Sequence, residues 1–162
     1  MIQNIIEINK KKYNYKLFDT NELIELSRHD KKFIKALEDT IKIYRNNNSF
    51  IITNLINEYI NSEPNTITKY SVIYKRNVIV STSRIIYNKK SGYINLVYVN
   101  PEYRGQKICQ NHIQHLIKLI NLSKYELHVL KDNTPALKCY ENIGFKKIKD
   151  VEPNTYLMRL KN

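Results

Sequence analysis

The sequence predicts an α/β or α+β domain with a mixed β-sheet, and three observations carry this prediction. Helical patterns dominate residues 1–67, the first part of the chain. Alternating apolar residues then predict an antiparallel meander at the start of residues 68–162. A strand–helix–strand unit follows, and because such a unit joins parallel strands, parallel and antiparallel pairs are expected in one sheet.

The first part is expected to be mainly helical, with one strand before its helices. Asp19 or Thr20 is placed to cap the first helix, and Glu22 stands three residues after Asp19, as a capping box requires. Asp30 is placed to cap the second helix. The expected elements are, in order, a strand at 13–18 and helices at 19–29, 30–45 and 49–62.

The second part is expected to hold the sheet. Thr68–Lys75 and Val78–Tyr87 alternate in polarity and flank a two-residue turn, which predicts a β-hairpin. The elements expected after it are a strand at Tyr93–Val99, a helix at 105–121, a strand at 125–130, a helix at 135–143 and strands at 145–151 and 155–160. The length suits one hydrophobic core, so we expect residues 1–162 to form a single domain.

The net charge of +12 raises the question of a nucleic-acid partner. The Lys and Arg residues are scattered over distant segments, and Asn, Ile, Lys and Tyr, all encoded by A/T-rich codons, are abundant throughout. We therefore interpret the charge as solvated faces, and nucleic acid is not expected as a partner. A positive field would still help to recruit an anionic cofactor or an acidic substrate.

Neither a targeting segment nor a membrane span is visible in the sequence. The start of the chain has charged and amide residues where a signal peptide needs an apolar segment, and no apolar run approaches the roughly 18 residues that span a bilayer. A cytoplasmic protein without membrane contact is therefore expected. Cys109 and Cys139 are too few for a disulfide framework or a metal cluster, so we expect reduced thiols and no metal site.

Two segments of the second part carry the functional signal. Asn100–Cys109 leads from a strand into a helix, and the free N–H groups of a helix start attract phosphate, although this signal is weak by itself. The segment DNTPALKCYENIGF is more specific, because the following residues stand at spacings that are hard to produce by chance: Asn133, Ala136, Tyr140, Gly144 and Phe145.

Together, VYVNPEYRGQKI and DNTPALKCYENIGF resemble the GNAT superfamily of acyl-CoA-dependent N-acetyltransferases. The match covers roughly the C-terminal half, from Tyr93 onward, while the N-terminal helices match only in kind. The resemblance implies a GNAT-like fold, which is a mixed, largely antiparallel sheet with a splayed parallel strand pair and flanking helices. It implies acetyl-CoA as the co-substrate, held in a V-shaped opening between the strands at Tyr93–Val99 and Tyr125–Leu130.

The resemblance also implies which residues bind the cofactor. The pyrophosphate would lie on backbone N–H groups between Arg104 and Cys109, and the pantetheine arm would bond to the edge of the first strand. The complete set implied for cofactor binding is Val97, Tyr98, Val99, Arg104, Gly105, Gln106, Lys107, Ile108, Cys109, Asn133 and Tyr140.

The phosphate loop departs from the family's signature, which is Arg or Gln, two residues, Gly, one residue, then Gly or Ala. Arg104 matches, but Lys107 and Cys109 stand at the two small positions. Cys109 is a mild departure. Two alternatives stay open for Lys107: its side chain crowds the pyrophosphate, or it turns aside and lends its ammonium group to it.

Acetyl transfer to an amine requires a base, an oxyanion stabiliser and an acid for the departing thiolate. Tyr140 stands at the position of the family's tyrosine acid, with core packing as the alternative. His128 lies five residues before Asn133 and twelve before Tyr140, where some relatives carry a glutamate, and a histidine can accept a proton near neutral pH. A strand histidine without a catalytic role is the alternative, Glu126 is a weaker candidate base, and His112 and His115 are expected on the surface.

The sequence therefore predicts an N-acetyltransferase that moves an acetyl group from acetyl-CoA to a primary amine by direct attack. The acceptor, a protein, a peptide or a small molecule, stays open, and so does a homodimer. The alternative is a non-catalytic GNAT-like binding module with a degenerate cofactor loop.

Overall fold

The computed structural model describes residues 1–45, 65–151 and 153–162, so the helix expected at 49–62 lies outside the described residues. The order of elements confirms most of the expected order in the second part. The elements are β1 (Ile2–Ile8), β2 (Lys11–Asp19), α1 (Thr20–His29), α2 (Lys31–Arg45), β3 (Ile67–Lys75), β4 (Val78–Tyr87), β5 (Ser91–Val99), the short 3₁₀ helix η1 (Pro101–Tyr103), α4 (Ile108–Ile120), β6 (Lys124–Leu130), α5 (Thr134–Ile143), β7 (Lys146–Val151) and β8 (Thr155–Lys161).

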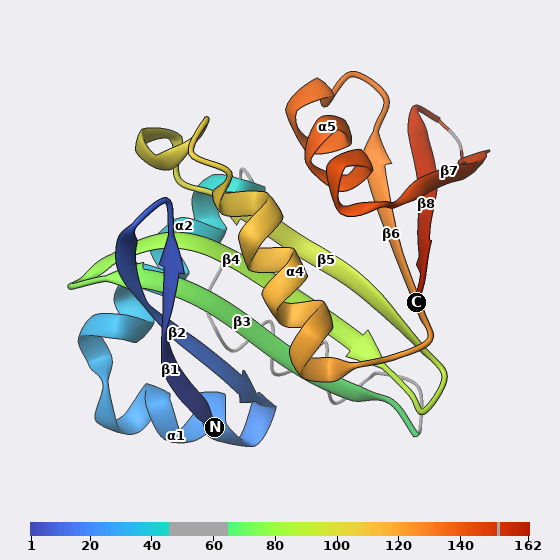
Figure 1. The fold of residues 1–162 in the computed structure, drawn as a ribbon. Coiled ribbons are helices and arrows are strands. Elements are labelled where there is room, and N and C mark those ends of the chain that lie inside the picture. The colour runs from blue at the N-terminus through green and yellow to red at the C-terminus, as the bar shows by residue number, and fades with distance from the viewer. Residues whose placement is uncertain (46–64, 152) are drawn as a thin grey trace.

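All described strands belong to one sheet with the order β1-β2-β3-β4-β5-β6-β8-β7. Every neighbouring pair is antiparallel except β5 and β6, which are parallel. Helix α4 crosses one face of the sheet, whereas α1 and α2 lie on the opposite face (Figure 1). The structure thus confirms the mixed, largely antiparallel sheet with one parallel pair and flanking helices.

Residues 1–45 are less helical than expected, because β1 was missed and β2 is longer than the predicted strand. Ile6 and Ile8 of β1 are buried, whereas Ile2 and Ile5 are exposed, as suits an edge strand. The β1–β2 turn contains no glycine, although Asn9 and Lys10 both have positive φ, 51° and 62°. A turn without glycine gave no clear hairpin signal in the sequence.

Local capping follows the sequence closely. Asp19 is the N-cap of α1, and its side chain forms a capping box with Glu22. The carboxylate of Asp30 accepts a hydrogen bond from the backbone N–H of Phe33, as expected for the cap of the second helix. Helix α4 begins at Ile108, later than expected.

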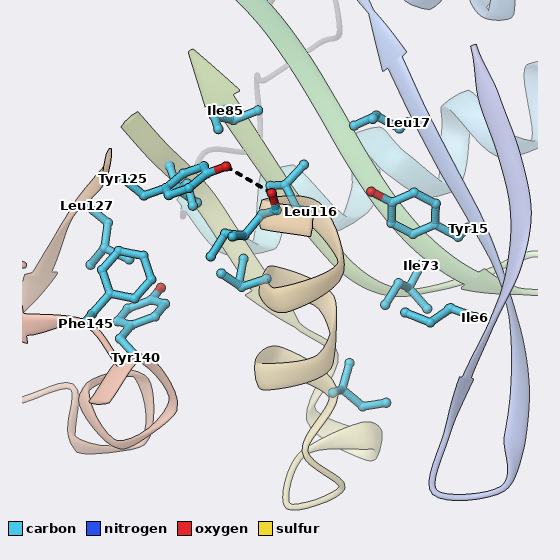
Figure 2. Packing of buried hydrophobic residues seen from close by; sticks show 14 of the residues in the cluster. Ile6, Tyr15, Leu17, Ile73, Ile85, Leu116, Tyr125, Leu127, Tyr140 and Phe145 are labelled. Atoms are coloured by element: carbon cyan, nitrogen blue, oxygen red, sulfur yellow. Dashed lines mark hydrogen bonds between the residues drawn. The ribbon is translucent and has the colours of Figure 1, made fainter. Parts of the chain in front are cut away.

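Two apolar clusters hold the layers together. The first contains side chains of β1–β6, β8, α4 and α5, and its residues include those labelled in Figure 2. The second lies between the sheet and α1 and α2, and its buried members are Phe18, Leu23, Leu26, Phe33, Ile34, Leu37, Ile41, Tyr70, Val72, Ile79 and Leu96. No helix of the described residues is long and apolar enough to cross a bilayer.

A polar network is buried beneath α4, where the sequence predicted surface histidines. His112 is fully buried, with Nε2 2.6 Å from Ser71 Oγ and Nδ1 2.7 Å from Ser81 Oγ. The hydroxyl of Ser71 also donates to that of Tyr15 at 2.9 Å. Burial, and to a lesser degree the nearby His115, lowers the pKa of His112 to about 3, so the ring is neutral. The expectation for His112 was therefore wrong.

Candidate functional site

The parallel pair β5–β6 is short, and the two strands separate beyond it. Their pairing runs only from Ser91–Ile94 against Lys124–Leu127. Just past this junction β5 is irregular, because its register with β4 shifts and Leu96 adopts a φ of 50°. Among the described residues no strand pairs with the β6-facing edge of β5 beyond Ile94. Val97, Tyr98 and Val99 therefore lie where β5 has left its parallel neighbour, as the splayed pair predicted.

The segment between β5 and α4 is a tight loop that ends in a helix start. Gly105 and Lys107 both have positive φ, 74° and 58°. The backbone N–H of Asn111 donates to the carbonyl of Lys107 at 3.1 Å, which is the first bond of α4. The N–H groups of the first turn, at 108–110, precede that bond, and such groups carry partial positive charge. The loop thus ends in backbone N–H groups of the kind that can bind an anion.

Lys107 stands at a position where glycine has a conformational advantage. It is the N-cap of α4 in the left-handed region, with φ 58° and ψ 18°, and its side chain makes no capping hydrogen bond. The side chain is exposed. A left-handed backbone costs a side-chain-bearing residue about 1–2 kcal/mol. The loop therefore adopts a left-handed turn at Lys107 without glycine, the residue that adopts it most easily.

Arg104 is joined to the strand that precedes the loop. Its Nε donates to the carbonyl of Val99 at 3.2 Å, so the side chain braces the end of β5. The residue is exposed, which leaves the remaining guanidinium nitrogens accessible to solvent. Arg104 therefore combines a structural contact with a free cationic face beside the loop.

The β1–β2 turn supports the loop from the other end of the sequence, a contact that sequence reasoning missed. Asn9 Nδ2 donates to the carbonyl of Gln106 at 2.8 Å. The ammonium group of Lys11 lies 3.4 Å from the side-chain oxygen of Gln106. The run NKKK, Asn9–Lys12, was the only signal, and its position next to the loop depends on the unexpected strand β1.

Much of the Asn-x-x-Ala-x-x-x-Tyr-x-x-x-Gly-Phe pattern builds α5. Asn133 is the N-cap, and its side chain accepts a hydrogen bond from the N–H of Ala136 at 3.2 Å. Gly144 ends the helix with a φ of 110°. Phe145 is buried against Tyr140, with 6.0 Å between ring centroids (Figure 2). Tyr140 is only 5% exposed, so its position is set by packing.

The cysteines are not reduced thiols in this structure, contrary to the sequence expectation. Cys109, in the first turn of α4, forms a disulfide with Cys139 of α5. The pair is 30 residues apart in sequence, and only the fold brings the two helices together. No group of three or more potential metal ligands occurs in the described part of the chain.

His128 lies on the face of β6 that points away from α4 and α5. Its neighbours Leu127 and Val129 are buried in the first apolar cluster, whereas His128 is exposed. Nδ1 of His128 is 2.9 Å from the hydroxyl of Tyr93 on β5. His128 thus stands immediately after the last parallel pair, Ile94–Leu127, where the two strands begin to separate.

The weaker candidate base, Glu126, is committed to an ion pair. One of its carboxylate oxygens lies 2.6 Å from a guanidinium nitrogen of Arg159 on β8 and accepts a second bond from Arg159 Nε at 2.8 Å. Both contacts of Arg159 are made to the same oxygen, Oε1, so an incoming ammonium group would have to displace the arginine to reach it. The contact favours His128 over Glu126 as a base.

The fold gathers most of the predicted site residues around the separation of β5 and β6. Val97, Val99 and Cys109 pack against the same apolar cluster that contains Tyr140. Arg104, Lys107 and Asn133 are exposed at the loop and at the start of α5. The arrangement offers an open strand edge, a set of backbone N–H donors and a buried tyrosine, which together suit an extended ligand with an anionic end.

Comparison with protein families agrees with this geometry. The family model described as the acetyltransferase (GNAT) family matches residues 22–145, so the chain belongs to that family. Members of the family are acyl-CoA-dependent acetyltransferases. A search of curated protein sequences found no match.

Several solved structures similar to this chain are acetyltransferases, each of low sequence identity to it. Ribosomal-protein-S5-alanine acetyltransferase from Vibrio fischeri aligns with a TM-score of 0.60 and 14% identity, over 100% of this chain and 97% of that chain. Spermidine N-acetyltransferase from Vibrio cholerae, in complex with CoA and spermine, aligns with a TM-score of 0.58 and 18% identity, over 91% of this chain and 95% of that chain. N-acetyltransferase PseH from Campylobacter jejuni, in complex with acetyl coenzyme A, aligns with a TM-score of 0.57 and 19% identity, over 91% of this chain and 98% of that chain. At these identities the likeness shows the fold alone.

Proposed function

We propose that this protein is an N-acetyltransferase that transfers an acetyl group from acetyl-CoA to a primary amine by direct attack. The observation that carries the proposal is the separation of β5 and β6 beside the start of α4. An open strand edge there can bind the amides of a pantetheine arm as a neighbouring strand would. The loop at 104–109 supplies backbone donors for the pyrophosphate at the end of that edge.

Several residues of the loop at 104–109 would bind the pyrophosphate of the cofactor. The N–H groups of Ile108 and Cys109 would donate to the pyrophosphate, and Gly105 and Gln106 would shape the loop around it. Arg104 and Lys107, both exposed, would neutralise its charge. Val97, Tyr98 and Val99 would offer the strand edge, and Asn133 would contact the cofactor with the amide nitrogen that its capping bond leaves available.

His128 is proposed as the base that removes a proton from the incoming ammonium group. It is exposed, so an acceptor can reach it, and it lies at the point where the strands separate. The hydroxyl of Tyr93 holds one ring nitrogen, which leaves the other nitrogen, Nε2, to exchange the proton directly or through water.

Tyr140 is proposed as the acid. The neutral amine attacks the thioester carbon, a C–N bond forms, and a backbone N–H near Val97–Val99 stabilises the oxyanion. The C–S bond then breaks, and the hydroxyl of Tyr140 protonates the departing thiolate. The proton lost by the newly acylated nitrogen returns Tyr140 to its neutral form through water. Burial against Phe145 fixes the ring, so the proton is delivered from a defined position.

The acceptor class is a primary amine. Two of the similar structures are named for acceptors of this kind, a ribosomal-protein alanine and spermidine. These acceptors share only the amino group, which is the group that His128 would deprotonate. A cytoplasmic location and a homodimer stay predictions from the sequence.

Calorimetry with acetyl-CoA, followed by an acetylation screen over peptides and small amines, tests this function. We expect binding below millimolar ligand and acetylation of at least one amine. His128→Ala should lower the catalytic rate near neutral pH and flatten the acidic limb of its pH profile. An unchanged profile would remove His128 from the mechanism, and no binding at millimolar acetyl-CoA would favour the non-catalytic module.

A further inference from the structure

A disulfide joins α4 and α5, the two helices that flank the separation of β5 and β6. Cys109 is the second residue of α4, which follows β5 through the phosphate-type loop, and Cys139 stands in α5, which follows β6. Cys139 directly precedes Tyr140 in sequence. Both cysteines pack against the apolar cluster that contains Tyr140, and Val97 and Val99 pack against the same cluster.

The bridge joins two parts of the molecule at the end opposite their strand pairing. One part carries β1–β5 and α4, and the other carries β6–β8 and α5. The strands that connect them are paired only over Ser91–Ile94 and Lys124–Leu127. Both helices follow strands that have already separated, as Figure 1 shows for the ribbon. The Cys109–Cys139 bond joins the two helices across the open end of the V.

The spacing at the bridge is too small for a ligand chain to pass. The Cα atoms of Cys109 and Cys139 are 6.3 Å apart. A chain lying between two backbones makes a carbon–carbon contact of about 3.5–4.0 Å on each side, which requires about 7–8 Å between them. The bonded sulfur atoms also fill the space between the two backbones. An arm inserted between α4 and α5 at this level would therefore meet the bridge.

We infer that Cys109 and Cys139 are a redox-reactive site within the acyl-CoA cleft, whose disulfide excludes the pantetheine arm and whose reduction by a dithiol admits it. This inference rests on the proposed acetyl-CoA function. In the reaction, the dithiol's two sulfurs become its own disulfide, and the Cys109–Cys139 bond breaks. The two electrons and two protons pass to the cysteines, which become thiols.

The site is reachable by the reductant. Cys109 and Cys139 are both half-buried, so a small thiol in solution can approach a sulfur atom. Once reduced, α4 and α5 lose their covalent link, and the width between them depends on side-chain packing alone. The oxidised and reduced forms of the protein therefore differ in the space between α4 and α5, where the pantetheine arm must enter.

The experiment measures acetyl-CoA binding by calorimetry for the wild-type protein in oxidised and dithiothreitol-reduced form. Alkylation followed by mass spectrometry counts the free thiols in each sample. We expect the oxidised protein to bind at least 10-fold more weakly than the reduced protein. Cys139→Ser should bind with the same affinity in both conditions, because it cannot form the bridge. Lys138→Ser, an exposed change on the same helix that keeps both cysteines, should retain the redox difference.

Equal affinities of the oxidised and reduced wild-type protein would overturn the inference. It would also fail if both thiols stayed free to alkylate after treatment with an oxidant. If neither the reduced wild type nor Cys139→Ser bound acetyl-CoA, the proposed function itself would fall, and this result is distinct from tight binding that ignores the redox state.

Discussion

The buried histidine beneath α4 makes stability depend on pH in a way that can be worked out from the structure. His112 is fully buried between Ser71 and Ser81 and stays neutral, with a pKa of about 3. In the unfolded chain a histidine has a pKa of about 6.5. Below pH 6.5 the unfolded state therefore binds a proton that the folded state does not, so stability is lost as the pH falls from 6.5 towards 3.

The loss of unfolding free energy at pH 5 follows from the difference between the pKa of His112 in the folded and the unfolded state. A group that titrates at about 6.5 only in the unfolded state contributes about 2 kcal/mol of destabilisation at pH 5 relative to pH 7. With a slope of about 2 kcal/mol per M of urea, the unfolding midpoint would fall by about 1 M. Because any folded pKa below about 4 gives nearly the same value, the estimate depends little on how far the pKa is lowered.

Urea unfolding of the wild type and of His112→Gln at pH 7 and pH 5 provides the assay. The variant is expected to be less stable at pH 7, because a buried hydrogen-bond network is broken. Between pH 7 and pH 5 the variant's free energy of unfolding should fall by about 2 kcal/mol less than that of the wild type, since glutamine does not titrate. His115, which contacts Tyr15 nearby, and the carboxylates are present in both proteins. Equal losses in the two proteins, or protonation of His112 in NMR spectra of the folded wild type at pH 5, would refute the reasoning.

Three further predictions concern the site. Lys107→Gly should be more stable than Lys107→Ala by about 1 kcal/mol, or about 2–4 °C in melting temperature, because only glycine adopts the left-handed backbone freely; equal melting would contradict the assigned strain. Lys11→Gln should weaken acetyl-CoA binding about 2–5-fold in calorimetry, and more than Lys12→Gln, whose side chain points to the opposite face of β2; equal effects would argue against a role for the β1–β2 turn. Tyr140→Phe should lower kcat by about 10²–10⁴-fold with the affinity for acetyl-CoA unchanged, and wild-type kcat would exclude it as the acid.

The sequence was informative wherever a local rule fixes the structure. The capping box at Asp19, the cap at Asp30 and the hairpin at 68–87 were all predicted, because each depends on residues a few positions apart. The pattern from Asn133 to Phe145 was recognised for the same reason, since it encodes the start and the end of α5.

The features that were missed depend on contacts between distant segments. Strand β1 was not predicted, because its turn contains no glycine and because only alternate isoleucines near its end are buried. His112 lies on the stripe 108–112–116 of α4, a spacing that signals burial, but its polarity suggested the surface. The disulfide joins residues 30 positions apart, so nothing short-range could reveal it.

The brevity of the parallel junction also bears on how the protein opens and folds. Strands β6, β8 and β7 form a locally connected unit, in which β6 pairs with β8 and β8 with β7. This unit meets the rest of the sheet through four residue pairs. When the Cys109–Cys139 bridge is reduced, such an arrangement favours two cooperative units with separate opening free energies. Amide hydrogens at the junction are then expected to exchange before those of the β2–β4 ladder, and the docking of the two units is expected to be the last event of folding.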